Sequence, residues 1–258
     1  MTLPFTPPLF ERFADSIRSL PSLAMYGPEH LCTPTFRLYS DPRIEMFYAP
    51  FDFVNTSAKV AIVGITPGFR HMEIAFRVAR AALAAGKSGA EVCRQAKAAA
   101  SFAGPMRHNL ISMLADIELH YWLGIPNPAL LFDSHGSLLH TTSAIRYPVF
   151  VHGDKYDNYT GHAPALLRHP VLHDMVFDVL SPELAEVPGA LIIPLGKAVE
   201  GCLSALVSAG VLNPERCLLG FPHPSDGPGW PDNKQKFELN LDMLKTKTAG
   251  WFTKTAGA

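Results

Sequence analysis

The sequence predicts an α/β protein with three layers, α/β/α, around a short and mainly parallel sheet of four strands. Two observations support this fold class. Short apolar segments rich in β-branched residues alternate with longer segments of helical periodicity, which is the pattern of layered α/β domains. Glycine- and proline-rich turns follow these apolar segments, and such turns lie at the carboxyl edge of a parallel sheet, where ligands usually bind.

The most clearly marked strand is residues 59–65, an apolar run that ends in the turn Gly64-Ile-Thr-Pro-Gly68. A run of this kind is typical of a buried strand in a parallel sheet. The second strand is unusually polar, so we expect its side chains to need hydrogen-bond partners. Pro194 is expected to end the third, because proline cannot donate to a sheet. The four predicted strands cover residues 59–65, 138–145, 190–195 and 216–221.

Apolar residues at helical spacing predict helices before, between and after these strands. We expect a β-hairpin over residues 149–156, with its turn at Gly153-Asp154. Residues 1–56 are expected to form a helix and an irregular lead-in, with room for one short edge strand, packed on a single domain of residues 57–258. The predicted helices cover residues 5–20, 72–85, 90–100, 109–123, 171–180, 196–209 and 232–247.

Composition limits the classes of function. The 48% hydrophobic content is sufficient for a large core, and no apolar run reaches the length of a transmembrane helix. The four cysteines form no Cys-x-x-Cys pair, so we expect reduced thiols and no metal site. The formal net charge of −1 argues against a globally basic nucleic-acid binder but allows a local basic strip. Residues 1–8 lack the features of a signal peptide, and we expect a cytoplasmic protein.

Three strand ends carry glycine or polar residues: the turn Gly64–Gly68, the pair Thr142-Ser143, and the loop His223-Pro-Ser225. If the strands are parallel, these ends meet at one edge of the sheet, so we expect them to line a common cleft. Glycines in the first turn would let the backbone approach a ligand closely, and Pro67 would stiffen that approach. An ordinary strand-to-helix turn is the alternative for the first motif taken alone.

At these residues the chain resembles the uracil-DNA glycosylase superfamily. Gly64–Gly68 and His223–Ser225 resemble its two signature motifs in the expected order, and Gly196-Lys197 and Phe102–Gly104 add to the match. The resemblance extends from residue 57 to the C-terminal helix. It implies a four-stranded parallel sheet flanked by helices. It also implies an enzyme, without metal or cofactor, that flips a nucleotide out of DNA and hydrolyses the bond between base and sugar.

The resemblance assigns roles to individual residues. His223 would donate a hydrogen bond to the departing base as negative charge develops on it, and Thr66 would orient the attacking water. The implied base-binding residues are Ile65, Phe102 and Ser143. The implied DNA-binding residues are Gly64, Pro67, Gly68, Ser225, Arg107 and Trp230.

Two parts of the implied site depart from the family pattern. The family usually carries Asp or Asn at the third position of the first turn, or Glu at the second, where this chain has Thr66 and Ile65. A threonine hydroxyl can orient water but is not a strong base, and Glu73 or His71 are alternatives for that task. Ser143 stands where the family has its base-reading Asn, and a hydroxyl discriminates less than an amide.

Structural alternatives accompany three of the implied contacts. Phe102 is almost as well interpreted as a core residue, anchoring of the loop to the core is the more common role for a residue such as Trp230, and Arg107 is alternatively a surface residue. Two functions therefore remain: a monomeric DNA glycosylase that removes a deaminated or modified base such as uracil, or a protein that keeps the fold and binds DNA without reaction. A small-molecule hydrolase or nucleotide-binding protein is disfavoured by the absence of a Gly-x-Ser-x-Gly elbow and of a P-loop.

Overall fold

The computed structural model describes residues 3–152, 157–225 and 227–256. The chain is a mixed α/β protein, as predicted, and divides into two compact units, each built from three stretches of sequence. The domain boundary expected at residue 57 stays a prediction. Unit 1 comprises Met1–Phe53, Ile65–Ser101 and Ser143–Leu180. Unit 2 comprises Val54–Gly64, Phe102–Thr142 and Ser181–Ala258.

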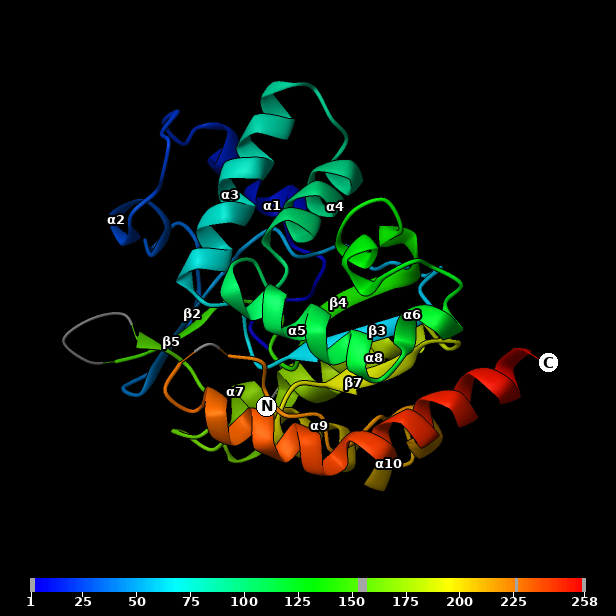
Figure 1. Ribbon diagram of the computed structural model, residues 1–258. Coiled ribbons are helices and arrows are strands. Elements are labelled where there is room, and N and C mark those ends of the chain that lie inside the picture. Colours follow the sequence, from blue (N-terminus) through cyan, green and yellow to red (C-terminus); the bar gives the residue numbers. More distant parts are fainter. Residues whose placement is uncertain (1–2, 153–156, 226, 257–258) are drawn as a thin grey trace. The chain divides into compact units, whose positions relative to one another are not determined.

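Unit 2 contains a parallel sheet in which β3 lies between β4 and β7 (Figure 1). In β3 every residue is buried, as expected for a central strand covered on both faces. Val60 of β3 pairs with Leu191 of β7, and Val63 pairs with Pro194, where β7 ends as predicted. The strands of this sheet are β3 (Val60–Gly64), β4 (Leu139–Ser143) and β7 (Leu191–Pro194).

The predicted fourth strand, residues 216–221, is wrong, and among the described residues the parallel sheet has three strands. A single parallel bridge joins Cys217 to Ile192 of β7. Pro214–Arg216 forms a 3₁₀ turn, and the buried Arg216 guanidinium donates to backbone carbonyls that include those of Val187 and Ala190. Gly220 then turns the chain away at a φ of +97°. The segment is therefore extended for too short a distance to form a strand.

The main core of unit 2 covers one face of this sheet. It takes alternate residues of each strand, such as Val60 and Ile62 of β3, together with apolar residues of α5, α6 and α10. His140 alternates with Leu139 on β4 and contacts Glu183 of α8, so α8 lies at the opposite face. The helices of unit 2 are α5 (Pro105–Asp116), α6 (Leu119–Trp122), α8 (Ser181–Ala185), α9 (Lys197–Ser208) and α10 (Trp230–Ala256), with 3₁₀ segments at Pro128–Phe132 and Gly136–Leu138.

Unit 1 contains an antiparallel sheet in the order β1-β2-β5-β6, which the sequence did not predict beyond one edge strand and a hairpin. A hairpin is present, since Phe150 pairs with Asn158, but its second strand lies beyond the predicted range of residues 149–156. The predicted turn at Gly153-Asp154 lies outside the described residues. All four residues of β2 are buried, so the polar–apolar alternation that marks a half-exposed strand is missing. The strands are β1 (Arg37–Ser40), β2 (Ile44–Phe47), β5 (Val149–Val151) and β6 (Asp157–Asn158).

Helices α1, α3 and α4 cover aromatic residues of unit 1. Phe13 of α1 stacks on Tyr48 with ring centroids 4.2 Å apart, and Phe76 of α3 contacts Phe36 edge-on at 4.7 Å. The helices of unit 1 are α1 (Phe10–Arg18), α2 (Pro28–Leu31), α3 (Phe69–Ala84), α4 (Gly89–Ala100) and α7 (Pro170–Asp174), with a 3₁₀ turn at Leu166–Arg168 and a π-helical turn at Met175–Leu180.

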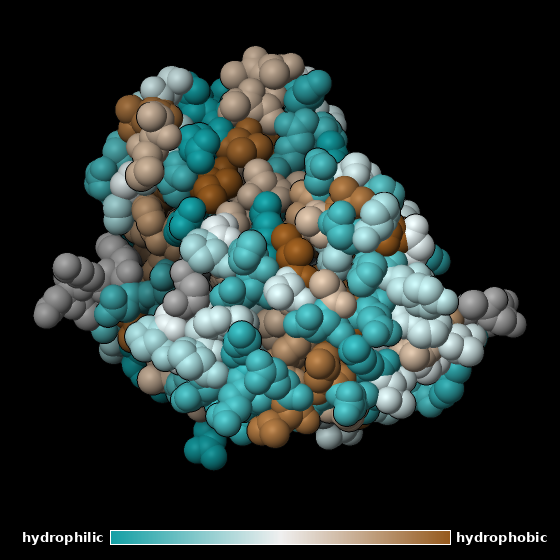
Figure 2. Space-filling view, in the orientation of Figure 1, coloured by the Kyte–Doolittle hydropathy of each residue, from teal (hydrophilic) through white to brown (hydrophobic). Residues whose placement is uncertain are grey.

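Most predicted helices are confirmed with shifted ends, but the one over 109–123 is wrong as a single helix. It breaks into α5 and α6 at Glu118, which has a φ of +60°. None of the described helices is both long and apolar enough to cross a membrane. On the face drawn in Figure 2, hydrophobic residues occur in small groups among hydrophilic ones.

Candidate functional site

The loop that carries His223 lies against the turn that follows β7, and both belong to unit 2. The Gly196 N–H donates to the Phe221 carbonyl at 2.9 Å. Gly196 has a φ of +87°, and a Cβ added to it would lie 3.2 Å from the His223 Cβ. Glycine is therefore required here by its backbone conformation and by the close approach of the histidine. The carboxyl end of β7 thus sets the position of His223.

The His223 ring is held in one tautomer by its own loop. The backbone N–H of Ser225 donates to Nδ1 at 3.2 Å, so in the neutral ring the proton resides on Nε2. Burial lowers the pKa of His223 below its ordinary value, because desolvation disfavours the charged form. His223 is therefore a neutral imidazole near pH 7, with its Nε2–H as a hydrogen-bond donor.

Phe102, Arg107 and Trp230 are all half-buried in unit 2. Phe102, at a φ of +53°, and Trp230, at the start of α10, both pack against the main core of the unit. The Arg107 guanidinium lies 5.1 Å from the centroid of the Phe132 ring, and burial lowers its pKa. These contacts favour the core and anchor interpretations of the two aromatic residues, and Arg107 is not simply a surface residue. Their contacts with DNA stay predictions.

The turn after β3 belongs to unit 1 and is fixed there by hydrogen bonds. The Thr66 hydroxyl donates to the Tyr147 carbonyl at 2.9 Å, and the Ile145 N–H donates to the Ile65 carbonyl at 2.9 Å. This turn therefore lies beside the segment that follows β4, and Ser143, the last residue of β4, is half-buried.

Gly68 closes the same turn against β6. A Cβ at Gly68 would lie 3.0 Å from Oδ1 of Asn158, an atom that also accepts a hydrogen bond from the Phe69 N–H at 2.9 Å. Gly68 itself has an ordinary φ of −81°, so the approach of Asn158, and not the backbone conformation, is what limits the space for a side chain here. Pro67 is half-buried, and Gly64 is the buried last residue of β3 in unit 2. The cleft expected to unite all the predicted residues stays a prediction.

The two alternatives for activating water differ in their surroundings. Glu73 is 6% exposed and forms an ion pair with Arg77, whose Nε lies 2.9 Å from its Oε1. Its carboxylate is therefore already engaged within unit 1. His71 precedes it on α3 and is half-buried.

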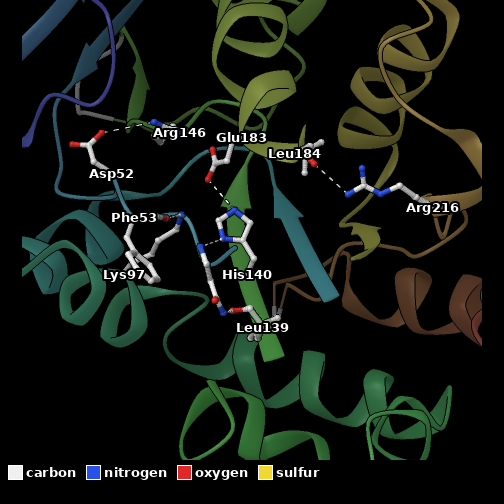
Figure 3. A network of polar contacts seen from close by, with 10 residues as sticks. Asp52, Phe53, Lys97, Leu139, His140, Arg146, Glu183, Leu184 and Arg216 are labelled. Atoms are coloured by element: carbon white, nitrogen blue, oxygen red, sulfur yellow. Dashed lines mark hydrogen bonds and ion pairs between the residues drawn. The ribbon is translucent and has the colours of Figure 1, made fainter. Parts of the chain in front are cut away.

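Buried polar clusters that the sequence did not identify occur in both units (Figure 3). In unit 1, Asp52 accepts hydrogen bonds from the hydroxyls of Tyr48, at 3.0 Å, and Tyr147, and burial raises its pKa. In unit 2, Nδ1 of His140 accepts from the Asn55 N–H at 3.3 Å, so Nε2–H donates to Glu183 at 2.9 Å. The polar character of the second predicted strand had indicated such a partner for His140.

Neither the cysteines nor any described cluster of ligating residues forms a metal site. All four cysteines are free thiols, as predicted, and burial raises the pKa of Cys93 and Cys202 to about 12. Within the described parts of the chain, no group of three or more His, Cys, Asp or Glu side chains could hold a metal ion.

Comparison with known proteins adds one relative. No protein-family model matches the chain, and no solved structure matches it. The chain is 39% identical over 237 residues to the Bacillus subtilis (strain 168) protein with the name "Uncharacterized protein YoxB". The alignment covers 91% of this chain and 90% of that protein. Because the identity extends over nearly the whole of both chains, the chain belongs to the same family as YoxB.

Proposed function

We propose that the protein is a DNA glycosylase of the uracil-DNA glycosylase superfamily. It hydrolyses the N-glycosidic bond of a deaminated or modified base, uracil or a related base, after that base is flipped out of the DNA. The observation that carries this proposal is the state of His223: a half-buried, neutral imidazole whose Nδ1 accepts a hydrogen bond from the Ser225 N–H and whose Nε2–H is a donor.

A donor of this kind fits the chemistry of base release. As the bond between sugar and base breaks, electrons move onto the base, and negative charge develops on its carbonyl oxygen. A fixed neutral donor stabilises that charge without having to give up its proton. The lowered pKa of His223 favours the neutral ring, so the ring can donate to the base without carrying a charge of its own.

The arrangement of strands in unit 2 supports the same proposal. The bridge from Ile192 places Cys217 beside β7, on the side away from β3. The order is β4-β3-β7 and then a single bridge at Cys217, which lies beside β7 on the edge where a four-stranded sheet would have its fourth strand. His223 follows Cys217 by six residues, in the loop that comes after this bridge.

Basic side chains accompany the same loops. Lys197 is exposed at the start of α9, directly after Gly196, and Lys234 and Lys236 are exposed near the start of α10. Cationic side chains next to the His223 loop would bind phosphates and orient a DNA strand without reading its sequence. DNA is therefore the proposed partner, and a monomer is the proposed acting form.

The experiment is an excision assay on single- and double-stranded oligonucleotides that contain uracil, hypoxanthine, xanthine or 5-hydroxymethyluracil. We expect alkali-labile abasic sites with at least one base, and on the order of a 100-fold loss of rate in His223→Ala. His162→Ala, which removes an exposed histidine of unit 1, is the matched control and should keep full activity. Absence of abasic product from every base would overturn the proposal, and so would equal activity of His223→Ala and the wild type.

Thr66 favours a second candidate, a DNA-binding protein that has lost the reaction. Its hydroxyl donates to the Tyr147 carbonyl, so it can still accept a hydrogen bond from water, but unlike a carboxylate it cannot take up the proton of that water. This candidate predicts salt-sensitive retention of DNA in a gel shift, with intact oligonucleotide recovered afterwards. Product formation at any of the tested bases would exclude it.

A further inference from the structure

Asparagine side chains from two helices hold the backbone of the His223 loop. In unit 2, Asn109 of α5 donates to the Pro224 carbonyl at 3.2 Å, and Asn233 of α10 donates to the His223 carbonyl at 3.0 Å. Asn240 of α10 donates to the Gly220 carbonyl at 2.9 Å. Three carbonyl groups within five residues of chain therefore accept hydrogen bonds from side-chain amides.

The sequence of the loop explains why it depends on donors from outside. Pro222 and Pro224 lack an N–H group, so the loop cannot build a regular ladder of its own hydrogen bonds. Asn233 and Asn240 are seven residues apart on α10, which places them on the same face of the helix. Asn109 approaches from a different helix, so the loop is held by two elements.

The entry to the loop is fixed in the same way. The Gly220 N–H donates to the Glu200 carboxylate of α9, while its carbonyl accepts from Asn240. Gly220 has a φ of +97°, and a Cβ there would lie 2.8 Å from the Met243 Cε. The chain therefore has a defined direction where it leaves the sheet and turns towards His223.

The contact of Asn109 bears directly on the imidazole. The Pro224 carbonyl and the Ser225 N–H belong to one planar peptide group. The Asn109 side chain donates to the oxygen of this peptide group. The N–H of the same group, that of Ser225, donates to Nδ1 of His223 at 3.2 Å. Fixing the oxygen fixes the plane and hence the direction of the N–H. Donation to the carbonyl also polarises the peptide and strengthens its N–H as a donor.

We propose that Asn109 is a positioning residue that acts through the Pro224–Ser225 peptide to hold His223 in its Nε2–H tautomer. Asn233 supports it by fixing the preceding peptide, whose carbonyl it binds. The relevance of this arrangement to base excision rests on the proposed function. The arrangement itself can be tested without any substrate.

The test measures the His223 ring directly. Long-range ¹H–¹⁵N NMR spectra of histidine-labelled full-length protein distinguish a protonated ring nitrogen from an unprotonated one, and His223→Gln identifies the signals. In the wild type we expect one neutral tautomer with Nε2 protonated near pH 7. In Asn109→Ala we expect a mixture of tautomers and an upward shift of the His223 pKa. The hydrogen bond from the Ser225 N–H to Nδ1, which favours the neutral ring, is weakened, and the ring becomes more solvated.

Asn213→Ala is the matched control, because the Asn213 side chain caps the 3₁₀ turn at Pro214–Arg216 by accepting a hydrogen bond from the Glu215 N–H. It should leave the His223 spectrum unchanged. Asn109→Asp keeps the size of the side chain but removes its N–H donors, and it serves if Asn109→Ala does not fold. An unchanged His223 tautomer and titration in a folded Asn109 variant would overturn the proposal.

An activity arm separates this inference from the proposed function. If the wild type excises a base, Asn109→Ala should lower kcat on the order of 10- to 100-fold, with little change in KM. If the wild type excises none, the proposed function fails, while the NMR result still decides whether Asn109 holds the ring. If the wild type excises a base but the His223 tautomer is the same in Asn109→Ala, the proposed function stands and the positioning role of Asn109 is wrong.

Discussion

Gly196 illustrates how one residue can constrain the candidate site. Any other residue would have to adopt a φ of +87° and bring its Cβ to 3.2 Å from that of His223. We therefore expect Gly196→Ala to lower the free energy of unfolding by about 1–3 kcal/mol and to raise the His223 pKa as the loop is displaced. Urea unfolding and NMR titration measure the two effects.

Gly201, in the helix α9 that begins directly after Gly196, provides the control. It lies on α9 with nothing within 4 Å of an added Cβ, so Gly201→Ala should stabilise the protein by about 0.5–1 kcal/mol. Equal effects of the two substitutions would show that Gly196 is not constrained by its position beside His223.

Asp41 in unit 1 predicts a dependence of stability on pH. Burial alone would raise its pKa, but hydrogen bonds from the backbone N–H groups of Arg43 and Ile44 and from the side chains of His169 and Tyr39 outweigh this and lower it to about 2. The folded state therefore favours the carboxylate. This contribution is present above pH 4 and is lost as the pH falls from about 4 to 2.

The measurement compares urea unfolding of the wild type and Asp41→Asn between pH 7 and pH 2. After allowance for solvent screening, we expect the wild type to be more stable by about 1–2 kcal/mol at neutral pH, and the difference to shrink below pH 4. A difference that is constant over this range would contradict the assigned role of Asp41.

At the scale of elements, the junction of α5 and α6 makes a prediction of its own. Glu118 adopts a left-handed conformation at a φ of +60°, which is unfavourable for residues with a Cβ. Its carboxylate contacts Lys245 at 3.0 Å on the surface, a pair that contributes little. Glu118→Gly and Glu118→Ala both lose this pair, but only glycine relieves the backbone. We expect Glu118→Gly to be more stable than Glu118→Ala by about 1 kcal/mol in thermal or urea unfolding.

The elements that could be predicted from sequence are those whose pattern is local. The strand of residues 60–64 and the helices α3, α4 and α9 follow from apolar runs and helical spacing. The antiparallel sheet of unit 1 could not be predicted in this way, because β2 is buried throughout and β6 has only two residues. The segment 216–221 has the composition of a strand, but long-range contacts of Arg216 and the turn at Gly220 override it.

In the candidate site, too, the residues within local motifs could be predicted from the sequence, whereas the residues that contact them from other elements could not. The two motifs identify His223 and Thr66, because their spacing along the chain is a sequence property. The residues that hold them are not visible in the sequence. Asn109 and Asn233 are ordinary helix residues until the fold places their amides at the carbonyls of the His223 loop. The polar second strand is an intermediate case, since it indicated that His140 needs a partner without identifying Glu183.

For the whole molecule, the formal net charge of −1 determines how DNA could bind. A protein without overall positive charge gains nothing from long-range attraction to a polyanion, so binding must rely on a few local cations. Each phosphate contact releases counterions, and the logarithm of the binding constant then falls with the logarithm of salt concentration by about 0.9 per contact.

Lys234 and Lys236, exposed near the start of α10, are the cations whose loss should reduce this slope. We expect Lys234→Ala and Lys236→Ala each to lower it by about 1, as measured by fluorescence anisotropy with an oligonucleotide over a range of salt concentrations. Lys254→Ala is the control, because Lys254 lies on the same helix about 30 Å further on and pairs with Glu215. If all three substitutions change the slope equally, DNA is attracted by the charge of the helix as a whole, and the His223 loop does not locate the binding surface.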